Sequence, residues 1–232
     1  MQLYEQIIAF YKNLSLDAAY LPKEVKVMNP YRGKNSHITL RVMEEFYKKF
    51  YTDNHPRRMI LGINPGRHGA GVTGLMFTDT IRLNEICGIE LREFHSRELS
   101  SEFFYQVIER YGGVSKFYND FYIGAISPLG FTITNDNGKE VNYNYYDSKD
   151  LQNAVLSFIK STLKAQLQLN IDTDICYCLG TGKNLKFLMK INNNLNLFKK
   201  IIPLDHPRYI MQYKRKQLPG YIDKFITAFD SK

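Results

Sequence analysis

Apolar side chains recur at helical spacing in several stretches of the chain, and these stretches predict amphipathic helices. The first covers residues 1–18, and the second ends near Phe50. Further helices are expected over residues 79–87, 102–111, 148–169, 218–229 and from Lys183 onward. Ser100 or Ser101 is expected to cap the helix over 102–111, and Ser148 the long helix that follows it.

Short apolar runs separate these helices and predict buried strands. They cover residues 59–63, 121–127, 174–179 and 199–204. Buried strands that alternate with helices form parallel sheets covered on both faces. The pattern therefore predicts an α/β fold, a three-layer α/β/α arrangement around a central, mainly parallel four-stranded sheet. No linker or repeat divides the chain, so residues 1–232 are expected to form a single domain.

Three further segments lie outside that alternation. Residues 131–145 alternate between apolar and polar around Asn135-Asp136-Asn137-Gly138, a turn sequence that predicts a β-hairpin. Residues 21–35 contain two prolines and several lysines and are expected to be a connection, while residues 192–196 are expected to be a polar loop.

The composition indicates a folded core and a polyanionic partner. Of the 232 residues, 44% are hydrophobic and 14% aromatic, which excludes intrinsic disorder. The formal net charge of +8 favours nucleic acid as the partner. No apolar run approaches the roughly 18 residues of a membrane span, and the N-terminus lacks a signal peptide, so no membrane association is expected.

The cysteines predict a reduced protein without a metal centre. Cys87, Cys176 and Cys178 are an odd number without zinc-binding spacing, and they are too few for an iron–sulfur cluster held by four thiolates. Cys176 and Cys178 are expected on one face of a buried strand. The acidic residues show no metal-binding spacing, so no metal or cofactor is expected, and a reducing, cytoplasmic location follows.

The strand over residues 59–63 ends at an Asn-Pro-Gly turn. Pro65 removes a backbone donor and restricts its own φ, while Gly66 tolerates backbone angles forbidden to other residues. In open α/β sheets, ligands bind beyond the carboxyl ends of the strands. The turn therefore places the amide of Asn64 at the mouth of a candidate site. The alternative is a tight turn without a function.

The strand over residues 199–204 ends in a similar way, because polar residues and then a proline follow it, at Asp205-His206-Pro207. If both strands are parallel and near the centre of the sheet, Asn64 and His206 face each other across one cleft. An amide and an imidazole at that position favour a catalytic site. For His206 alone, the alternative is a loop histidine without a role.

Residues 180–183 read Gly-Thr-Gly-Lys before an expected helix. They lack the spacing of a loop that binds nucleoside triphosphates. The start of a helix with Lys183 can nevertheless hold one DNA phosphate, because backbone N–H groups favour an anion there. A plain strand-to-helix turn is the alternative.

Residues 209–216 combine aromatic, apolar and basic side chains directly after His206. This mixture suits a wedge that enters a base stack beside lysines on the backbone, with an exposed helix start as the alternative. Three arginines around the first strand are expected to extend a basic rim, namely Arg57, Arg58 and Arg67.

Taken together, these residues resemble the SMUG branch of the uracil-DNA glycosylase superfamily. Residues 62–66 and 73–77 are similar to its first motif, and Phe77 follows Asn64 by thirteen residues as in that branch. His206, Pro207 and Arg208 are similar to the second motif, and residues 127–129 to the end of the middle strand. The resemblance covers nearly the whole chain.

The resemblance implies hydrolytic excision of a deaminated base, chiefly uracil, from single- or double-stranded DNA by a monomer without metal or cofactor. Asn64 would hold the attacking water, Phe77 would stack on the flipped base, and His206 would stabilise the leaving base. The base pocket would comprise Gly62, Ile63, Pro65, Gly66, Phe77, Ala125 and Ser127. The expected DNA contacts are Arg67, Lys183, Arg208, Tyr209, Lys214 and Arg215.

One departure concerns recognition of the base. The family's middle strand supplies an asparagine that reads the uracil edge, and that position is Ala125 here. Ser127 or a backbone group is a possible substitute for the asparagine. The smaller side chain of Ala125 also leaves space for another deaminated base such as xanthine. No lysine occupies a motif position as a nucleophile, so a monofunctional glycosylase is expected.

Two other functions compete with this interpretation. A DNA-binding module of the same fold without catalysis is favoured by Ala125. A hydrolase of free nucleosides is disfavoured by the basic charge and by residues 209–216.

Overall fold

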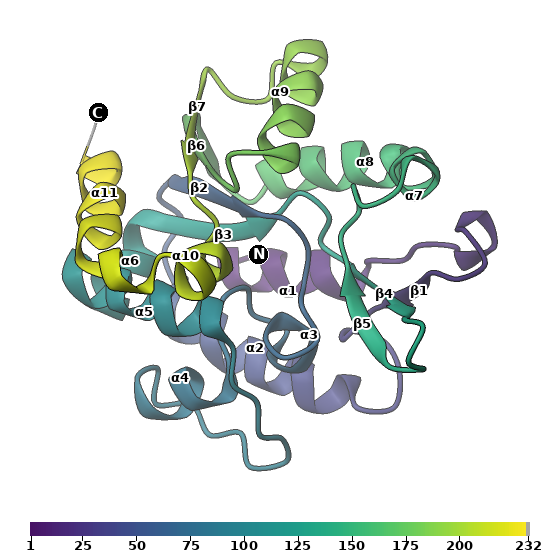
Figure 1. Ribbon diagram of the computed structural model, residues 1–232. Helices are drawn as coiled ribbons and strands as arrows, with labels where there is room; N and C mark the ends of the chain where they lie inside the picture. The colour runs from purple at the N-terminus through teal and green to yellow at the C-terminus, as the bar shows by residue number, and fades with distance from the viewer. Residues whose placement is uncertain (231–232) are drawn as a thin grey trace.

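Four parallel strands form the central sheet of the computed structural model, which describes residues 1–230 (Figure 1). The order is β3 (Phe121–Ala125), β2 (Arg57–Gly62), β6 (Ile171–Leu179) and β7 (Lys200–Leu204). Every neighbouring pair is parallel. The structure confirms the predicted α/β fold with a four-stranded parallel sheet.

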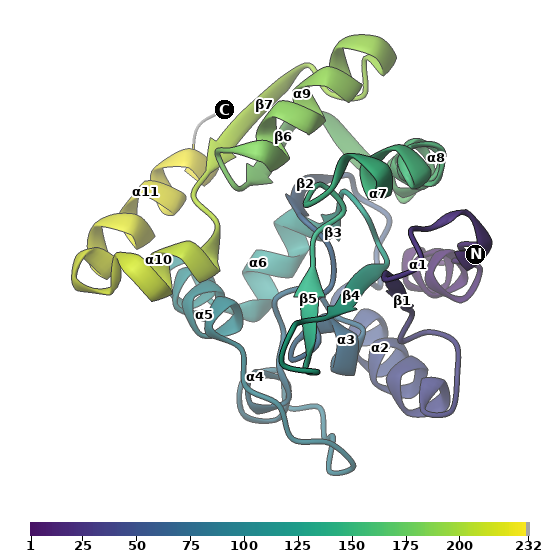
Figure 2. The ribbon, with the colours of Figure 1, turned by 45° about the vertical axis from the view of Figure 1, so that its right-hand side comes forward.

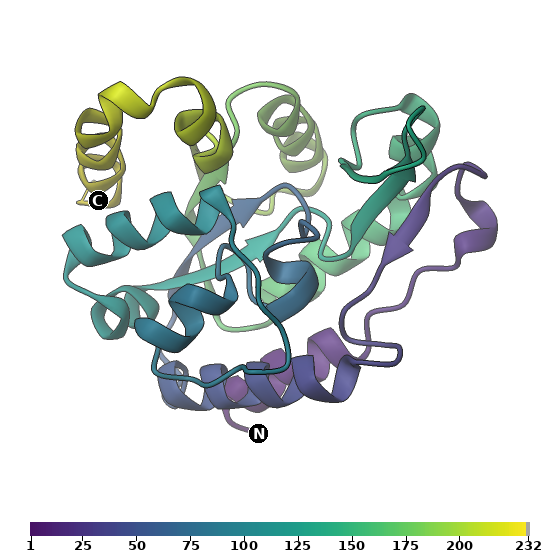
Figure 3. The same cartoon turned by 60° about the horizontal axis from the view of Figure 1, so that its bottom comes forward.

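Alternation along β3 shows which helices cover each face of the sheet. The Tyr122 hydroxyl meets the Tyr11 hydroxyl of α1 (Leu3–Lys12) at 3.2 Å, so α1 covers one face. Phe121 points the other way and packs against Tyr111 of α5 (Leu99–Tyr111) and Phe229 of α11 (Leu218–Asp230). Figure 3 shows the sheet between α1 and the C-terminal helices, which completes the three layers.

A second, smaller sheet was only partly expected. β4 (Gly130–Thr134) and β5 (Glu140–Tyr143) form the predicted hairpin. Residues 21–35 are not merely a connection, because β1 (Lys26–Met28) lies within them and pairs antiparallel with β4. Three residues are too few to show a strand period, so the sequence pattern missed β1.

The helical layers agree with most of the predictions, and the differences are local. The expected long helix breaks at Val155, and Ser148 caps its first part as predicted by accepting a hydrogen bond from the Leu151 amide at 3.1 Å. The expected loop at 192–196 is mostly helical, and the helix starting at 114 was not predicted. The remaining helices are α2 (Ser36–Phe50), α3 (Ala70–Thr73), α4 (Thr80–Glu85), α6 (Val114–Asp120), α7 (Lys149–Ala154), α8 (Leu156–Leu167), α9 (Lys183–Leu195) and α10 (Pro207–Tyr213), with 3₁₀ turns at Ala18–Tyr20 and Arg215–Gln217.

The predicted serine cap of α5 is wrong. The helix begins earlier, at Leu99, and Glu98 occupies the N-cap position. Ser100 and Ser101 lie within the helix and are buried. Ser101 has another partner, because its hydroxyl accepts a hydrogen bond from the Asp79 amide at 3.2 Å.

The carboxyl ends of β2 and β7 open toward the same edge of the sheet. In Figure 2, α10 and β5 flank the region where β2 ends. No helix within residues 1–230 is long and apolar enough to cross a membrane.

Candidate active site

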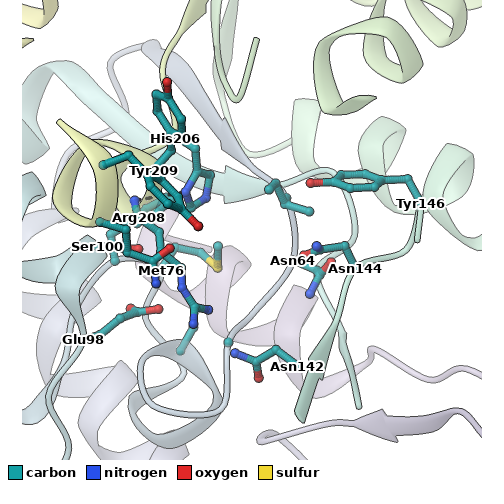
Figure 4. Close-up of a pocket in the computed structure, with 16 residues that line it drawn as sticks. Asn64, Met76, Glu98, Ser100, Asn142, Asn144, Tyr146, His206, Arg208 and Tyr209 are labelled. Carbon is teal, nitrogen blue, oxygen red and sulfur yellow. Dashed lines mark hydrogen bonds between the residues drawn. The ribbon is translucent and has the colours of Figure 1, made fainter. Parts of the chain in front are cut away.

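A cavity of about 310 Å³ lies at the carboxyl ends of β2 and β7. Asn64 and His206 both line it, as their positions at two strand ends predicted. In Figure 4, Asn64 lies on one side with Asn144 and Tyr146, while His206 faces it from α10. The parallel sheet thus brings an amide and an imidazole from distant parts of the chain into one space.

The amide of Asn64 is held in one orientation by backbone groups. Its Oδ1 accepts a hydrogen bond from the backbone amide of Tyr145 at 3.2 Å. Its Nδ2 donates weakly to the carbonyls of Pro65 at 3.3 Å and Tyr143 at 3.5 Å. A carbonyl oxygen has two lone pairs, and Tyr145 uses one. The other can accept a hydrogen bond from a water molecule or a substrate.

Tyr145 is in turn anchored in the core. Its side chain is fully buried, and its hydroxyl donates to Oδ1 of Asn184 at 2.7 Å. Asn184 lies in the first turn of α9 and donates from Nδ2 to the carbonyl of Leu179 at 2.9 Å. The segment that holds Asn64 is therefore fastened to the end of β6.

His206 is the N-cap of α10, and Pro207 starts the helix. The backbone amide of Arg208 donates to Nδ1 of His206 at 3.2 Å. Burial, reinforced by the positive charge of Arg208, lowers the pKa of His206 to about 4. The ring is therefore neutral at physiological pH. Because Nδ1 acts as an acceptor, the proton of the neutral ring lies on Nε2.

Phe77 forms an aromatic wall of the cavity. Its ring stacks on Phe104 at 5.0 Å between centroids and lies 5.9 Å from the ring of His206. Because Phe104 covers one face, only the other face is free to stack on a ligand. A Cβ at Gly62 would lie 3.1 Å from the Phe77 ring, so a larger residue there would displace the ring by a few tenths of an ångström.

Phe77 also has a backbone conformation that is unusual for its type, with φ +54°. Thr73 stabilises this left-handed turn, because its hydroxyl donates to the carbonyl of Thr78 at 2.6 Å and accepts from the Leu75 amide at 3.2 Å. Such conformations concentrate at functional sites, where surrounding contacts hold them in place.

Glu98 contributes a carboxyl group to the cavity wall. Burial, together with the neighbouring carboxylate of Asp79, raises the pKa of Glu98 to about 7, although Arg208 opposes the shift. Its side chain lies close to the loop that follows β2, since a Cβ added at Gly69 would meet the Glu98 carboxylate. The cavity therefore contains one acid that titrates near neutral pH.

Four of the residues expected in the base pocket do not line the cavity, namely Gly62, Pro65, Ala125 and Ser127. Ala125 is buried, and its carbonyl accepts a hydrogen bond from Nε2 of Gln166 at 3.1 Å. The Ser127 hydroxyl donates to the Leu129 carbonyl at 2.8 Å. Because Ser127 does not line the cavity, it does not take the place of the missing asparagine there. Ile63, Gly66 and Phe77 do line it.

The expected DNA contacts are divided between two places. Arg208 and Tyr209 lie on α10 at the cavity wall, whereas Lys183 lies outside it, with its Nζ 6.0 Å from the Tyr146 ring. Arg215 forms an ion pair with Glu102 at 3.2 Å. Lys214 follows α10 and is half-buried.

The arginines of β2 do not extend a basic rim as expected. Arg57 is buried and forms an ion pair with Asp53 at 2.9 Å. Arg58 donates to the Phe229 carbonyl and lies 4.5 Å above the Phe121 ring. Both residues lie at the start of β2, and the cavity lies at the opposite end of that strand. Arg67 does lie in the loop after β2, where its backbone amide donates to Oδ1 of Asn142 at 3.0 Å.

Sequence patterns missed several residues that line the cavity. They are Ala70, Glu98, Ser100, Asn142, Asn144 and Tyr146, whereas Met76, Gln212 and Tyr213 lie within the segments 73–77 and 209–216 that sequence patterns had already singled out. Asparagine and tyrosine alternate at the end of the hairpin, and this polar alternation is the one local signal that points to a site. Within residues 1–230, no three His, Cys, Asp or Glu side chains gather in a way that could hold a metal ion.

Comparisons with known proteins agree on one family. The family model of the uracil DNA glycosylase superfamily matches residues 49–230. The solved structure of wild-type Pedobacter heparinus SMUG2 is 50% identical, with a TM-score of 0.95, and the match covers 99% of this chain and 97% of that chain. A comparison with curated proteins found no match.

Proposed function

The chain belongs to the uracil DNA glycosylase superfamily, and we propose that it is a SMUG-like repair enzyme that flips a deaminated base out of DNA and hydrolyses its N-glycosidic bond. One observation carries the proposal: Asn64 and His206 line one cavity beside the free face of Phe77. Uracil is the first candidate for the base, with xanthine as the second.

In this proposal His206 stabilises the leaving base. Glycosidic cleavage passes through an oxocarbenium-like state in which negative charge develops on the base. The Nε2 proton of the neutral ring can donate to the base oxygen that gains this charge. A well-placed donor in a dry site is worth roughly 3–4 kcal/mol of transition-state stabilisation.

Asn64 positions the attacking water. An amide is not a base at neutral pH, but the unused lone pair of Oδ1 can hold a water molecule in place. Because backbone groups fix the amide, the water is held by a rigid partner. None of the residues that line the cavity is a lysine, so an amine nucleophile is not available there and monofunctional hydrolysis is expected.

The DNA is bound largely through its phosphates. Arg208, at the cavity wall, and the net charge of +8 support salt-dependent binding of the backbone. Extrusion of the base opposes binding by a few kcal/mol, and less in single strands or at mismatches. We place the reaction on DNA in a reducing bacterial-type cytoplasm and assign it to a monomer.

A non-catalytic DNA-binding module is the second candidate. It is favoured by one observation, the methyl group of Ala125 at the position where the family has an asparagine. The nucleoside hydrolase is the third, and it would not require DNA.

Excision from labelled oligonucleotides distinguishes the three candidates. Substrates carry uracil, xanthine or hypoxanthine, single-stranded or paired, with EDTA throughout. We expect alkali-sensitive sites with the wild type and with Asn137→Ala, an exposed control at the hairpin tip, and their loss with Asn64→Ala. Tight binding without cleavage would indicate the non-catalytic module. Base release from free nucleosides would indicate the hydrolase.

A further inference from the structure

A second hollow of about 430 Å³ lies beside the active-site cavity, between α7 and α9. Four lysines line it, and we call it the lysine groove: Lys149, Lys183, Lys186 and Lys190. All four are exposed. The last three recur on one face of α9, because residues spaced by three or four lie above one another on a helix.

The charge of the lysine groove is almost unopposed. Asp147 is the one carboxylate among its lining residues. Among the described residues, the lysines that form ion pairs with carboxylates are Lys199 and Lys224, and neither lines the groove. Four like charges without counterions destabilise one another unless a polyanion binds them.

The groove is continuous with the active site. Tyr146 lines both hollows, and Nζ of Lys183 lies 6.0 Å from the centroid of its ring. The hydrogen bond from the Tyr145 hydroxyl to Oδ1 of Asn184 joins the segment before α7 to α9. A chain that enters the active-site cavity can therefore continue past Tyr146 into the groove without leaving the surface.

We propose that the lysine groove binds the phosphodiester backbone of the strand that carries the flipped nucleotide, on one side of that nucleotide. This inference rests on the proposed function, and it adds a one-sided extension of the DNA site. From Lys183 to Lys190, α9 advances about 10 Å, at roughly 1.5 Å per residue. With phosphates about 3.4 Å apart along a stacked strand, this length corresponds to about three nucleotides.

Direct base contacts are not needed in this groove. Its basic side chains would follow the backbone, while Tyr146 offers a ring on which the first base beyond the flipped nucleotide can stack. The start of α9 adds backbone N–H groups, since its N-cap, Gly182, has no side chain to satisfy them.

The test measures binding and excision with uracil oligonucleotides that extend only to the 5′ side or only to the 3′ side of the uracil. The groove variant is Lys186→Gln/Lys190→Gln. The matched control is Lys12→Gln/Lys48→Gln, two exposed lysines on α1 and α2 in the layer far from the cavity. Thermal melting of each variant establishes that it is folded.

We expect the wild type to bind more tightly when the strand is extended on one side, and the groove variant to lose that gain. The slope of log affinity against log salt should fall by about 1.4 for two lost contacts, at about 0.7 each on a single strand. The control variant should keep both the gain and the slope. At saturating DNA, the control variant should excise uracil at the wild-type rate.

Three results would overturn the inference. The groove variant could keep the wild-type slope and extension gain, or the control could lose as much as the groove variant. The groove variant could also lose binding to phosphatidylglycerol vesicles while its DNA binding is unchanged, which would assign the groove to a membrane surface. Absence of excision by the wild type would instead contradict the proposed function, because the binding slopes are measured independently of cleavage.

Discussion

The backbone amide of Tyr145 donates to Oδ1 of Asn64 at 3.2 Å and so ties the end of β2 to the segment that follows β5. The carbonyls of Pro65 and Tyr143 face the other end of the amide. An amide fits this surrounding in one orientation only, with oxygen toward Tyr145 and nitrogen toward the two carbonyls. The site therefore distinguishes asparagine from aspartate.

Asn64→Asp should lose excision most strongly at high pH. The substituted oxygen would face two carbonyls, which raises the pKa of the new carboxyl and repels its ionised form. The protonated acid can donate to a carbonyl as the amide does, so part of the activity should return on acidification. Single-turnover rates across pH test this, with Asn64→Ala expected to stay low, by about 10²-fold or more, at every pH. Wild-type rates for Asn64→Asp at pH 8 would contradict the assignment.

Tyr145→Phe should lower both stability and the excision rate. The substitution removes the hydroxyl that donates to Asn184 and leaves a buried acceptor without its partner. That loss costs about 1–3 kcal/mol of unfolding free energy. Tyr143→Phe is the matched control, because its ring is only half-buried. Chemical denaturation and single-turnover excision measure the effects. Equal behaviour of the two variants would show that Tyr145 does not position Asn64.

His206 should act as a neutral donor down to mildly acidic pH. Its pKa of about 4 lies below the ordinary value of about 6.5, so the unfolded chain binds a proton first as pH falls. The stability that His206 contributes is present above pH 6.5 and declines toward pH 4. The ratio of wild-type to His206→Gln excision rates should therefore stay constant between pH 8 and about 5.5. A ratio that changes tenfold across pH 6.5 would indicate a charged imidazolium instead.

Glu98 should make the enzyme sensitive to pH near neutrality. Its pKa of about 7 means that the carboxyl loses its proton as pH rises through 7. The resulting charge opposes both a departing anionic base and an approaching phosphate. Wild-type excision should decline above pH 7, and Glu98→Gln, which keeps the size and removes the charge, should remove that decline.

The same residue links pH to stability with the opposite sign from His206. The folded protein holds the Glu98 proton more tightly than the unfolded chain, so stability falls as pH rises from about 4.5 to 7. Melting temperatures of the wild type and Glu98→Gln over that range isolate this contribution from that of His206. Parallel curves would show that Glu98 is already ionised in the folded protein.

Local signals determined most of the architecture. Short continuous apolar runs indicated all four strands of the parallel sheet, and apolar positions with a period of 3.6 residues indicated most helices. Proline and glycine after β2 and β7 marked where those strands end. Because parallel strands place their carboxyl ends at one edge, the order of elements was enough to predict that Asn64 and His206 share a cavity. Their catalytic roles stay predictions.

Only the tertiary structure decided how that cavity is completed. Asn142, Asn144 and Tyr146 reach it because the hairpin is docked by β1, whose three residues carry no period of their own. The pKa of Glu98 depends on burial beside Asp79, which lies in a different segment. Burial, hydrogen-bond partners and titration depend on atoms from several distant segments at once. A sequence pattern records only the neighbours along the chain, so these properties appear when packing brings the segments together.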